Sequence, residues 1–154
     1  MLELAQSDNQ YDQAWGERLL KQWERDGKLL STYDCPVQVV KFGDALTMVA
    51  LPGETVVDYS LRLKRELSKS IDKPHSIWVA GYSNDVFAYI PSRRVLEEGG
   101  YEAAGAMRYM TTTVQPGPFA SNVEERIVKK VHELDGRQPA RDNGVHRSSP
   151  GTIP

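Results

Sequence analysis

The sequence has little of the side chains that cross-link small folds or hold structural metals. Among its 154 residues there are one cysteine, Cys35, and three separate histidines. A single cysteine cannot form a disulfide within the chain, and no cysteine or histidine spacing matches that of a structural zinc site. The fold therefore has to be stabilised by the packing of apolar side chains.

Long apolar runs are missing too. No segment approaches the ~18 apolar residues of a membrane-spanning helix, and the N-terminus has no basic stretch followed by an apolar one. We therefore expect no transmembrane segment. Because no signal peptide is visible, the sequence leaves the localisation open.

An excess of positive charge is also absent. Lysine and arginine number 19 against 21 aspartate and glutamate residues, which gives a formal net charge of -2. Proteins that bind nucleic acids carry a basic surface, so we expect no nucleic-acid partner. The 40% of apolar and 26% of charged residues are typical of globular proteins. We expect a single α/β domain over residues 1–137 and a polar, disordered tail over residues 138–154.

Spacing of the apolar residues predicts the first elements. Trp15, Leu19 and Trp23 recur at helical spacing, which indicates an amphipathic helix over about residues 12–30 that ends near Gly27. Two runs rich in β-formers follow, at residues 36–42 and 45–51. They are joined by Gly43 and Asp44, a pair that suits a tight turn, so we expect a β-hairpin.

The second of these strands begins a βαβ unit. An amphipathic helix opens at Glu54, and residues 76–81 form a short, nearly continuous apolar run of the kind found in strands buried on both faces. We also expect a strand over residues 86–90 and helices over residues 92–98 and 122–134, the last with Leu134 on its inner face. The predicted fold is therefore α/β, with a small mixed β-sheet, a βαβ unit and flanking helices.

Three residues of these segments are candidates for a site. Glu54 lies where a strand ends and a helix begins, which is where open α/β sheets bind their ligands. A purely structural alternative is that an acid in the first helical turn stabilises the helix dipole by ~0.3 to 1 kcal/mol. Tyr89 and Tyr101 can likewise be half-buried tyrosines whose hydroxyl groups simply find a partner. The histidines, by contrast, are expected on the surface.

Five short motifs considered together resemble one protein family. They are Leu51-Pro52-Gly53-Glu54, Arg62-Leu63-Lys64-Arg65-Glu66, Val79-Ala80-Gly81-Tyr82-Ser83-Asn84-Asp85, Ala88-Tyr89-Ile90-Pro91 and Gly100-Tyr101-Glu102-Ala103-Ala104. In order and in spacing they resemble the C-terminal part of the catalytic domain of neutral/alkaline non-lysosomal ceramidases, especially of bacterial ceramidase-like proteins. The resemblance covers about residues 47–104, and a following Glu124-to-Val128 segment is also similar.

The resemblance implies a function and a metal. Family members are zinc amidohydrolases that cleave the amide of an N-acyl sphingoid base into a fatty acid and an amino alcohol. Glu54 matches the family's zinc-binding glutamate, Tyr89 its zinc-binding tyrosine, and Tyr101 the catalytic tyrosine that faces the scissile amide. Asn84 and Asp85 are candidates to support these residues. Such chemistry is plausible, because a nearby dication favours the phenolate of a tyrosine whose pKa is ordinarily ~10.

The chain also departs from the family. Family catalytic domains take two zinc-binding histidines, a histidine general base and an arginine from a long N-terminal region, and none of those motifs is present here. We therefore expect a C-terminal fragment of a ceramidase-like zinc amidohydrolase that carries half of the zinc site, binds zinc weakly or not at all, and is inactive alone. Its substrate would be a lipid amide, and its partner a complementary N-terminal polypeptide. The alternative is a non-catalytic binding or scaffolding module that retains the fold.

Overall fold

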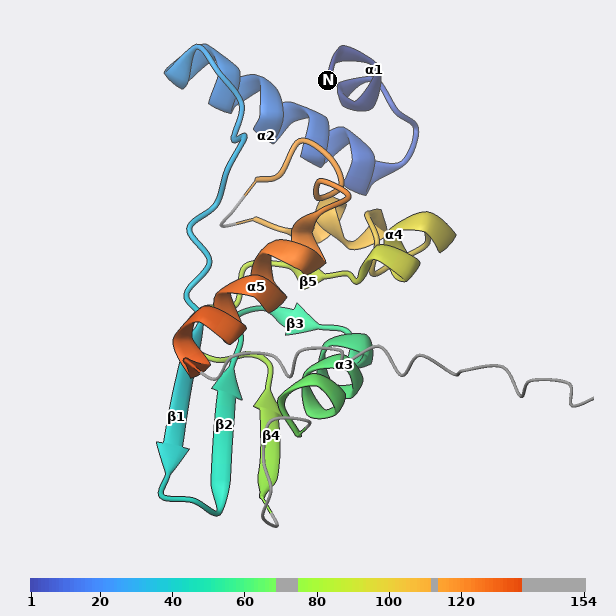
Figure 1. Cartoon of the computed structure of the whole chain (residues 1–154). Coiled ribbons are helices and arrows are strands. Elements are labelled where there is room, and N and C mark those ends of the chain that lie inside the picture. Colours follow the sequence, from blue (N-terminus) through green and yellow to red (C-terminus); the bar gives the residue numbers. More distant parts are fainter. Residues whose placement is uncertain (69–74, 112–113, 137–154) are drawn as a thin grey trace, which may run out of the picture.

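The computed structural model describes residues 1–68, 75–111 and 114–136. Its strands form a three-stranded sheet in the order β1-β2-β4 and a separate pair, β3 and β5, with helices packed around them (Figure 1). The predicted α/β class, with a small mixed sheet and flanking helices, is confirmed. The predicted disordered tail at residues 138–154 lies outside the described residues.

The sheet contains the predicted hairpin and βαβ unit. Strands β1 (Gln38–Phe42) and β2 (Leu46–Ala50) are antiparallel, and β4 (Ser76–Ala80) lies parallel to β2 on its other side. Helix α3 (Val57–Ser68) lies in the chain between the two parallel strands. The parallel pairing follows because a helical crossover returns the chain to the end of the sheet at which β2 began.

Glu54 departs from the predicted helix start. It belongs to β3 (Glu54–Thr55), which pairs in parallel with β5 (Tyr89–Ile90), and α3 begins only at Val57. The interpretation of Glu54 as an acid in the first helical turn is therefore wrong. Strand β5 is also shorter than the run 86–90 that the sequence predicted.

One face of the three-stranded sheet is packed against α3 and α5 (Val123–Asp135). Buried side chains come from the sheet and from both helices: Val49 from β2, Tyr59, Leu63 and Leu67 from α3, and Ile127, Val128 and Val131 from α5. Leu134, which was predicted to face inward, is 49% exposed because it lies on the outer side of the last turn of α5.

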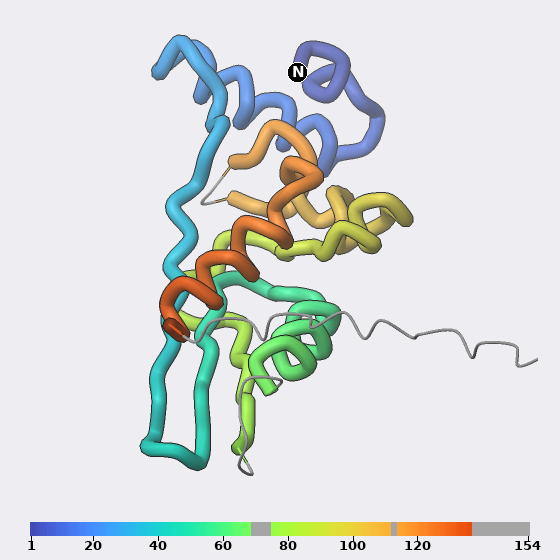
Figure 2. The backbone as a smooth tube through the Cα atoms, in the orientation of Figure 1, coloured from blue at the N-terminus to red at the C-terminus, as the bar shows by residue number. Residues whose placement is uncertain are grey.

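The N-terminal helices lie at the far end of the molecule from the sheet (Figure 1). Helix α1 (Leu2–Ala5) precedes α2 (Gln10–Asp26), which Asn9 caps and which Gly27 ends in a left-handed conformation. An extended segment over residues 28–37 then runs to β1 (Figure 2). Trp23 is 49% exposed, although the periodicity placed it on the buried face of this helix.

Two long-range hydrogen bonds fix α2 to the C-terminal half of the chain. The Trp15 indole donates to the Gln115 carbonyl at 2.8 Å, and the Arg18 guanidinium donates to the carbonyl of Arg108 at 2.7 Å, within the short helix η1 (Gly105–Tyr109). Within the described parts of the chain, none of the helices combines the length and the apolar character needed to cross a membrane.

Candidate functional site

The pairing of β3 with β5 brings two of the predicted site residues together. Glu54 lies directly opposite Tyr89 in the parallel register. The backbone hydrogen bond from Glu54 N to Ala88 O measures 2.9 Å, and that from Val56 N to Ile90 O measures 3.2 Å. Side chains at matched positions of neighbouring strands point to the same face, so the carboxylate and the phenol share one side of this pair.

Gly53 permits this close approach. Its φ of +62° lies in the left-handed region, and a Cβ at this position would lie 2.5 Å from the Ala88 carbonyl oxygen. Gly53 N also donates to Asp85 O, and Gly53 O accepts from Tyr82 N, both at 2.7 Å. The turn after β2 is thus hydrogen-bonded to the turn after β4, and these bonds fix the position of Glu54.

Tyr82 is a member of the site that the sequence reasoning missed. It is the second residue after β4 and has a φ of +52°, which is unusual for a residue other than glycine. Its pKa is raised, chiefly by a hydrogen bond to the Glu54 carboxylate. The available signal was its position, because polar groups that follow the carboxyl ends of parallel strands collect at one edge of the sheet.

The phenol of Tyr89 is held in its protonated form. Its pKa is raised well above the ordinary value, first by hydrogen bonding to the Glu54 carboxylate, then by burial and by the negative charge of that carboxylate. The Glu54 carboxylate is thus the largest cause of the raised pKa of both phenols, Tyr82 and Tyr89. Any cation bound by Glu54 and Tyr89 would have to replace the phenolic proton.

After helix α4 (Arg93–Glu98), the chain returns to β5 and places Tyr101 beside Tyr89. Its ring centroid lies 5.2 Å from that of Tyr89, with the ring planes at 72°. Aromatic contacts continue from Tyr101 to Tyr109 at 6.1 Å and from Tyr109 to Tyr11 of α2 at 4.9 Å. With its side chain 48% exposed, Tyr101 remains accessible to a ligand. We call Glu54, Tyr82, Tyr89 and Tyr101 the acid–tyrosine cluster.

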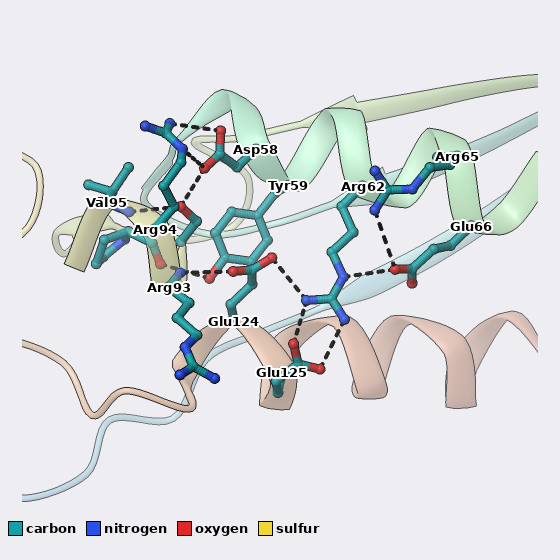
Figure 3. Close-up of polar contacts among 12 residues, drawn as sticks. Asp58, Tyr59, Arg62, Arg65, Glu66, Arg93, Arg94, Val95, Glu124 and Glu125 are labelled. Carbon is teal, nitrogen blue, oxygen red and sulfur yellow. Dashed lines mark hydrogen bonds and ion pairs between the residues drawn. The ribbon is translucent and has the colours of Figure 1, made fainter. Parts of the chain in front are cut away.

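A polar network positions β5 and α4 relative to α3 and α5 (Figure 3). Arg62 of α3 donates to Glu124 at 2.9 Å and to Glu125 at 2.6 Å, and the other oxygen of Glu124 accepts from the backbone N of Arg93 at 2.8 Å. The Tyr59 hydroxyl donates to the Pro91 carbonyl at 3.1 Å. These bonds hold the chain that leaves β5, so they fix the segment that carries Tyr89.

Two hollows flank the β3–β5 pair. A cavity of about 10 Å³, the size of one water position, lies between Tyr89 and Tyr101. A far larger pocket of about 900 Å³ has Phe87 and Ile90 among its lining residues. Because successive strand residues point to opposite sides, Ile90 and Tyr89 face different regions, and the large pocket is separate from the acid–tyrosine cluster.

The side chains of Asn84 and Asp85, predicted to support the site, are hydrogen-bonded elsewhere. The Asn84 amide donates to Gln38 at 3.0 Å, and Asp85 accepts from the Tyr33 hydroxyl at 2.5 Å. Asp85 contributes to the site through its backbone carbonyl, which accepts the bond from Gly53 described above.

The two described histidines have structural partners, and the single cysteine is not activated. His75 bonds to the Thr47 hydroxyl and to a backbone carbonyl, and His132 lies 2.8 Å from Glu66, while His146 lies outside the described residues. Burial, followed by the negative charge of Asp85, raises the pKa of the Cys35 thiol to about 11, so this thiol is not activated as a nucleophile.

The donor atoms of the cluster fit part of a zinc site. Glu54 and Tyr89 offer a carboxylate and a phenol from adjacent strands, both acceptable as oxygen ligands. No group of three or more histidine, cysteine, aspartate or glutamate side chains within residues 1–68, 75–111 and 114–136 is arranged to hold a metal ion. Zinc ligands other than Glu54 and Tyr89 would have to come from outside the described parts of the chain.

Comparisons of the chain with models of protein families, with curated proteins and with solved structures found no match.

Proposed function

We propose that this chain is the C-terminal part of the catalytic domain of a ceramidase-like zinc amidohydrolase, which hydrolyses the amide bond of an N-acyl sphingoid or related lipid. The observation that carries the proposal is the convergence of Glu54, Tyr89 and Tyr101. The resemblance assigns roles to these three residues from motif order alone, and three separate segments bring them into one cluster.

Glu54 and Tyr89 are the residues that would hold zinc. The bound ion would supply Lewis-acid polarisation of the amide carbonyl. Tyr89 must lose its proton to become a ligand, and its raised pKa opposes that loss at neutral pH. Two ligands, one of them protonated, are fewer than the three or four protein ligands of ordinary zinc sites, so the chain alone should bind zinc weakly.

Tyr101 would act on the substrate. Its half-exposed hydroxyl can donate a hydrogen bond to the oxygen that gains negative charge as the amide carbonyl is attacked. The general base and the histidine ligands are expected from a complementary N-terminal polypeptide. Without them, this chain has no described group positioned near Glu54 to activate water, and we expect it to be inactive alone.

Zinc binding tests the metal assignment. Competition with a chromophoric chelator should show weak binding by the chain, and Glu54→Gln and Tyr89→Phe should each abolish that binding. The matched controls are Glu24→Gln and Tyr11→Phe, which remove an exposed carboxylate and a hydroxyl outside the cluster. Equal zinc affinity in all four variants would contradict the assignment.

Hydrolysis tests the half-site. The chain alone should release no fatty acid from a ceramide. Adding the separately expressed N-terminal, histidine-bearing part of a ceramidase-family catalytic domain should produce turnover that Glu54→Gln and Tyr89→Phe each reduce at least ~100-fold, as expected for the loss of a metal ligand. The alternative, a non-catalytic module, predicts no turnover in any mixture, and robust turnover by the chain alone would overturn the half-site.

A further inference from the structure

The large pocket of about 900 Å³ lies outside the acid–tyrosine cluster and has no role in the proposed function. Its walls come from the extended segment over residues 28–37, from the loop at residues 115–120 and from helix α5 (Figure 2). Two buried side chains, Phe87 and Ile90, also line it. Pockets that bind small organic molecules usually measure roughly 300 to 1,000 Å³, so this one is large enough to hold such a ligand. We call it the α5 pocket.

Aromatic rings form part of the lining. The rings of Tyr33 and Phe87 are stacked, with their centroids 4.0 Å apart and their planes at 24°. The ring of Phe119 lies edge-on to Phe87, at 6.4 Å and 75°. All three residues line the pocket. Because aromatic rings pack favourably against the faces and edges of other rings, this lining favours a ligand that contains a flat ring system.

Positive charge exceeds negative charge around the α5 pocket. Arg126 and Lys130 lie one turn apart on α5, and Asp34 is the single acid among the described lining residues. Lys130 is 2.5 Å from Glu133, and Lys129 reaches the same carboxylate at 3.9 Å. The Arg126 side chain, by contrast, forms no hydrogen bond or ion pair within the described segments of the chain. Its guanidinium is therefore available to an anionic group, for which its geometry is well suited.

Gln115 gives a second, independent indication of a ligand. This lining residue is only 5% exposed, and its backbone carbonyl accepts from the Trp15 indole. The side-chain Nε2 of Gln115 is buried and donates to no acceptor among the described residues. A buried donor without an acceptor costs about 1 to 3 kcal/mol, so such groups usually have a partner. An oxygen atom of a bound ligand would supply the missing acceptor.

We propose that the α5 pocket binds a small organic anion with an aromatic ring system. Its carboxylate or sulfonate pairs with Arg126, one of its oxygen atoms accepts from Gln115, and its rings pack against the aromatic lining. Both polar groups are donors, so they select an acceptor-rich anion over a cation or a neutral ring. The pocket lies across β5 from the acid–tyrosine cluster, because Ile90 and Tyr89 point to opposite sides of the strand. The inference therefore does not depend on the zinc site.

Two probes that differ in charge test the proposal on the full chain. Anilinonaphthalene sulfonate is an aromatic anion whose fluorescence rises in apolar sites, and phenyl-naphthylamine has the same rings without the sulfonate. We expect saturable, one-to-one binding of the sulfonate that weakens as salt is added, because salt screens its attraction to Arg126. Binding of the neutral probe should not depend on salt. Absence of saturable binding, or a sulfonate affinity that salt leaves unchanged, would overturn the proposal.

Matched charge substitutions on α5 locate the anionic group. Arg126→Gln should weaken binding of the sulfonate about three- to tenfold, as expected for the loss of one charge-assisted contact at an exposed residue, and should leave the neutral probe unaffected. Lys129→Gln removes the same charge from an exposed residue that does not line the pocket, so it should change neither affinity. Equal weakening by the two variants would refute the role of Arg126.

Matched ring substitutions locate the aromatic part. Phe119→Leu keeps an apolar side chain but removes a ring from the lining, so both probes should bind about three- to tenfold more weakly. Phe42→Leu is the control, because it removes a ring that is 54% exposed on the sheet, and it should have no effect. Near-ultraviolet circular dichroism verifies that each variant keeps its packed core. Binding that is lost in Phe42→Leu but not in Phe119→Leu would place the probes on the sheet and overturn the proposal.

Cys35 reports independently on where the ligand lies. It is the only cysteine of the chain, and it lines the α5 pocket. The sulfonate probe should slow alkylation of this thiol by N-ethylmaleimide in proportion to the fraction of sites occupied, and Arg126→Gln should require more probe for the same protection. Unchanged alkylation at saturation would overturn the proposal. The same protection in Glu54→Gln would show that the α5 pocket functions whether or not the zinc assignment holds.

Discussion

Glu54 shows how a carboxylate influences the protonation of a neighbouring phenol, that of Tyr89. Hydrogen bonding to this carboxylate, together with its negative charge, raises the pKa of the phenol. A dication acts in the opposite direction, because it stabilises the phenolate and competes with the proton. Under the proposed function, the same two side chains would become zinc ligands only when a second polypeptide supplies the further ligands.

Gly53 provides the residue-scale prediction. Gly53→Ala should lower the free energy of unfolding by about 2 to 5 kcal/mol, because a left-handed φ and a contact 2.5 Å from the Ala88 oxygen both oppose a Cβ. Gly27→Ala is the matched control: its φ is +67°, but nothing lies within 4 Å of the added carbon, so about 1 to 2 kcal/mol is expected. Urea unfolding measures the free energy of unfolding of both variants. Equal losses of this free energy would show that a Cβ at residue 53 does not clash with the Ala88 oxygen in solution.

At the scale of elements, Arg62 links α3 to α5. Its guanidinium bonds to Glu66, Glu124 and Glu125, and its own side chain is 21% exposed (Figure 3). Hydrogen bonding to Arg62 lowers the pKa of Glu125. Burial would raise the pKa of Glu66, but hydrogen bonds from His132 and Arg62 outweigh it and lower that pKa as well.

Removing this arginine should destabilise the protein and change its response to acid. Arg62→Met should lower the free energy of unfolding at neutral pH by about 1.5 to 3 kcal/mol, mostly through the two less exposed carboxylates, Glu66 and Glu124. Carboxylates with lowered pKa values stabilise the folded state above their unfolded pKa, near ~4.3, and this contribution is lost as pH falls through the lowered values. The wild type should therefore lose more stability than Arg62→Met between neutral and strongly acidic pH.

The neighbouring Arg65 supplies the control for this comparison. Its side chain is 66% exposed and only reaches 4.0 Å from Glu66. Arg65→Met should leave both the stability and its acid dependence nearly unchanged. Chemical unfolding at a series of pH values measures the free energy of unfolding of each variant. If this free energy fell with pH in the same way for wild type and for Arg62→Met, the role of the network would be refuted.

At the scale of the whole molecule, one side of the sheet is packed against α3 and α5, while the other side carries the exposed side chains of Val40, Phe42 and Trp78. The α1–α2 pair lies at the other end of the molecule, and strands β3 and β5, which carry Glu54 and Tyr89, lie between that pair and the sheet (Figure 1). The core is therefore one-sided, built from a single face of the sheet and the helices α3 and α5.

A one-sided core predicts an asymmetric response to substitution. Leu63→Ala, at a fully buried position of α3, should lower the free energy of unfolding by about 2 to 5 kcal/mol. Trp78→Lys, at a position 56% exposed on the other side of the sheet, should change it by only ~0.5 kcal/mol, like a surface substitution. Leu61→Ala on the exposed side of α3 should behave in the same way. A large loss for Trp78→Lys would mean that the Trp78 side chain is packed within this chain.

Local patterns predicted much of this architecture. The hairpin, the βαβ unit and helix α5 follow from alternation, helical periodicity and glycine-containing turns, which act over a few residues. Glu54 was placed wrongly, because its strand exists only through pairing with Tyr89, far away in the chain. Tyr82 was missed for the same reason, since its contact with Glu54 depends on hydrogen bonds between two separate turns.

What the sequence by itself determined is the kind of elements, their order and the motifs that resemble one family, because these depend on side-chain type and short-range spacing. Only the tertiary structure decided that Glu54, Tyr82, Tyr89 and Tyr101 meet, and that Trp78 remains exposed. Both depend on which backbone segments pair and which faces find a layer to pack against, and such long-range contacts are stable only when the whole fold forms.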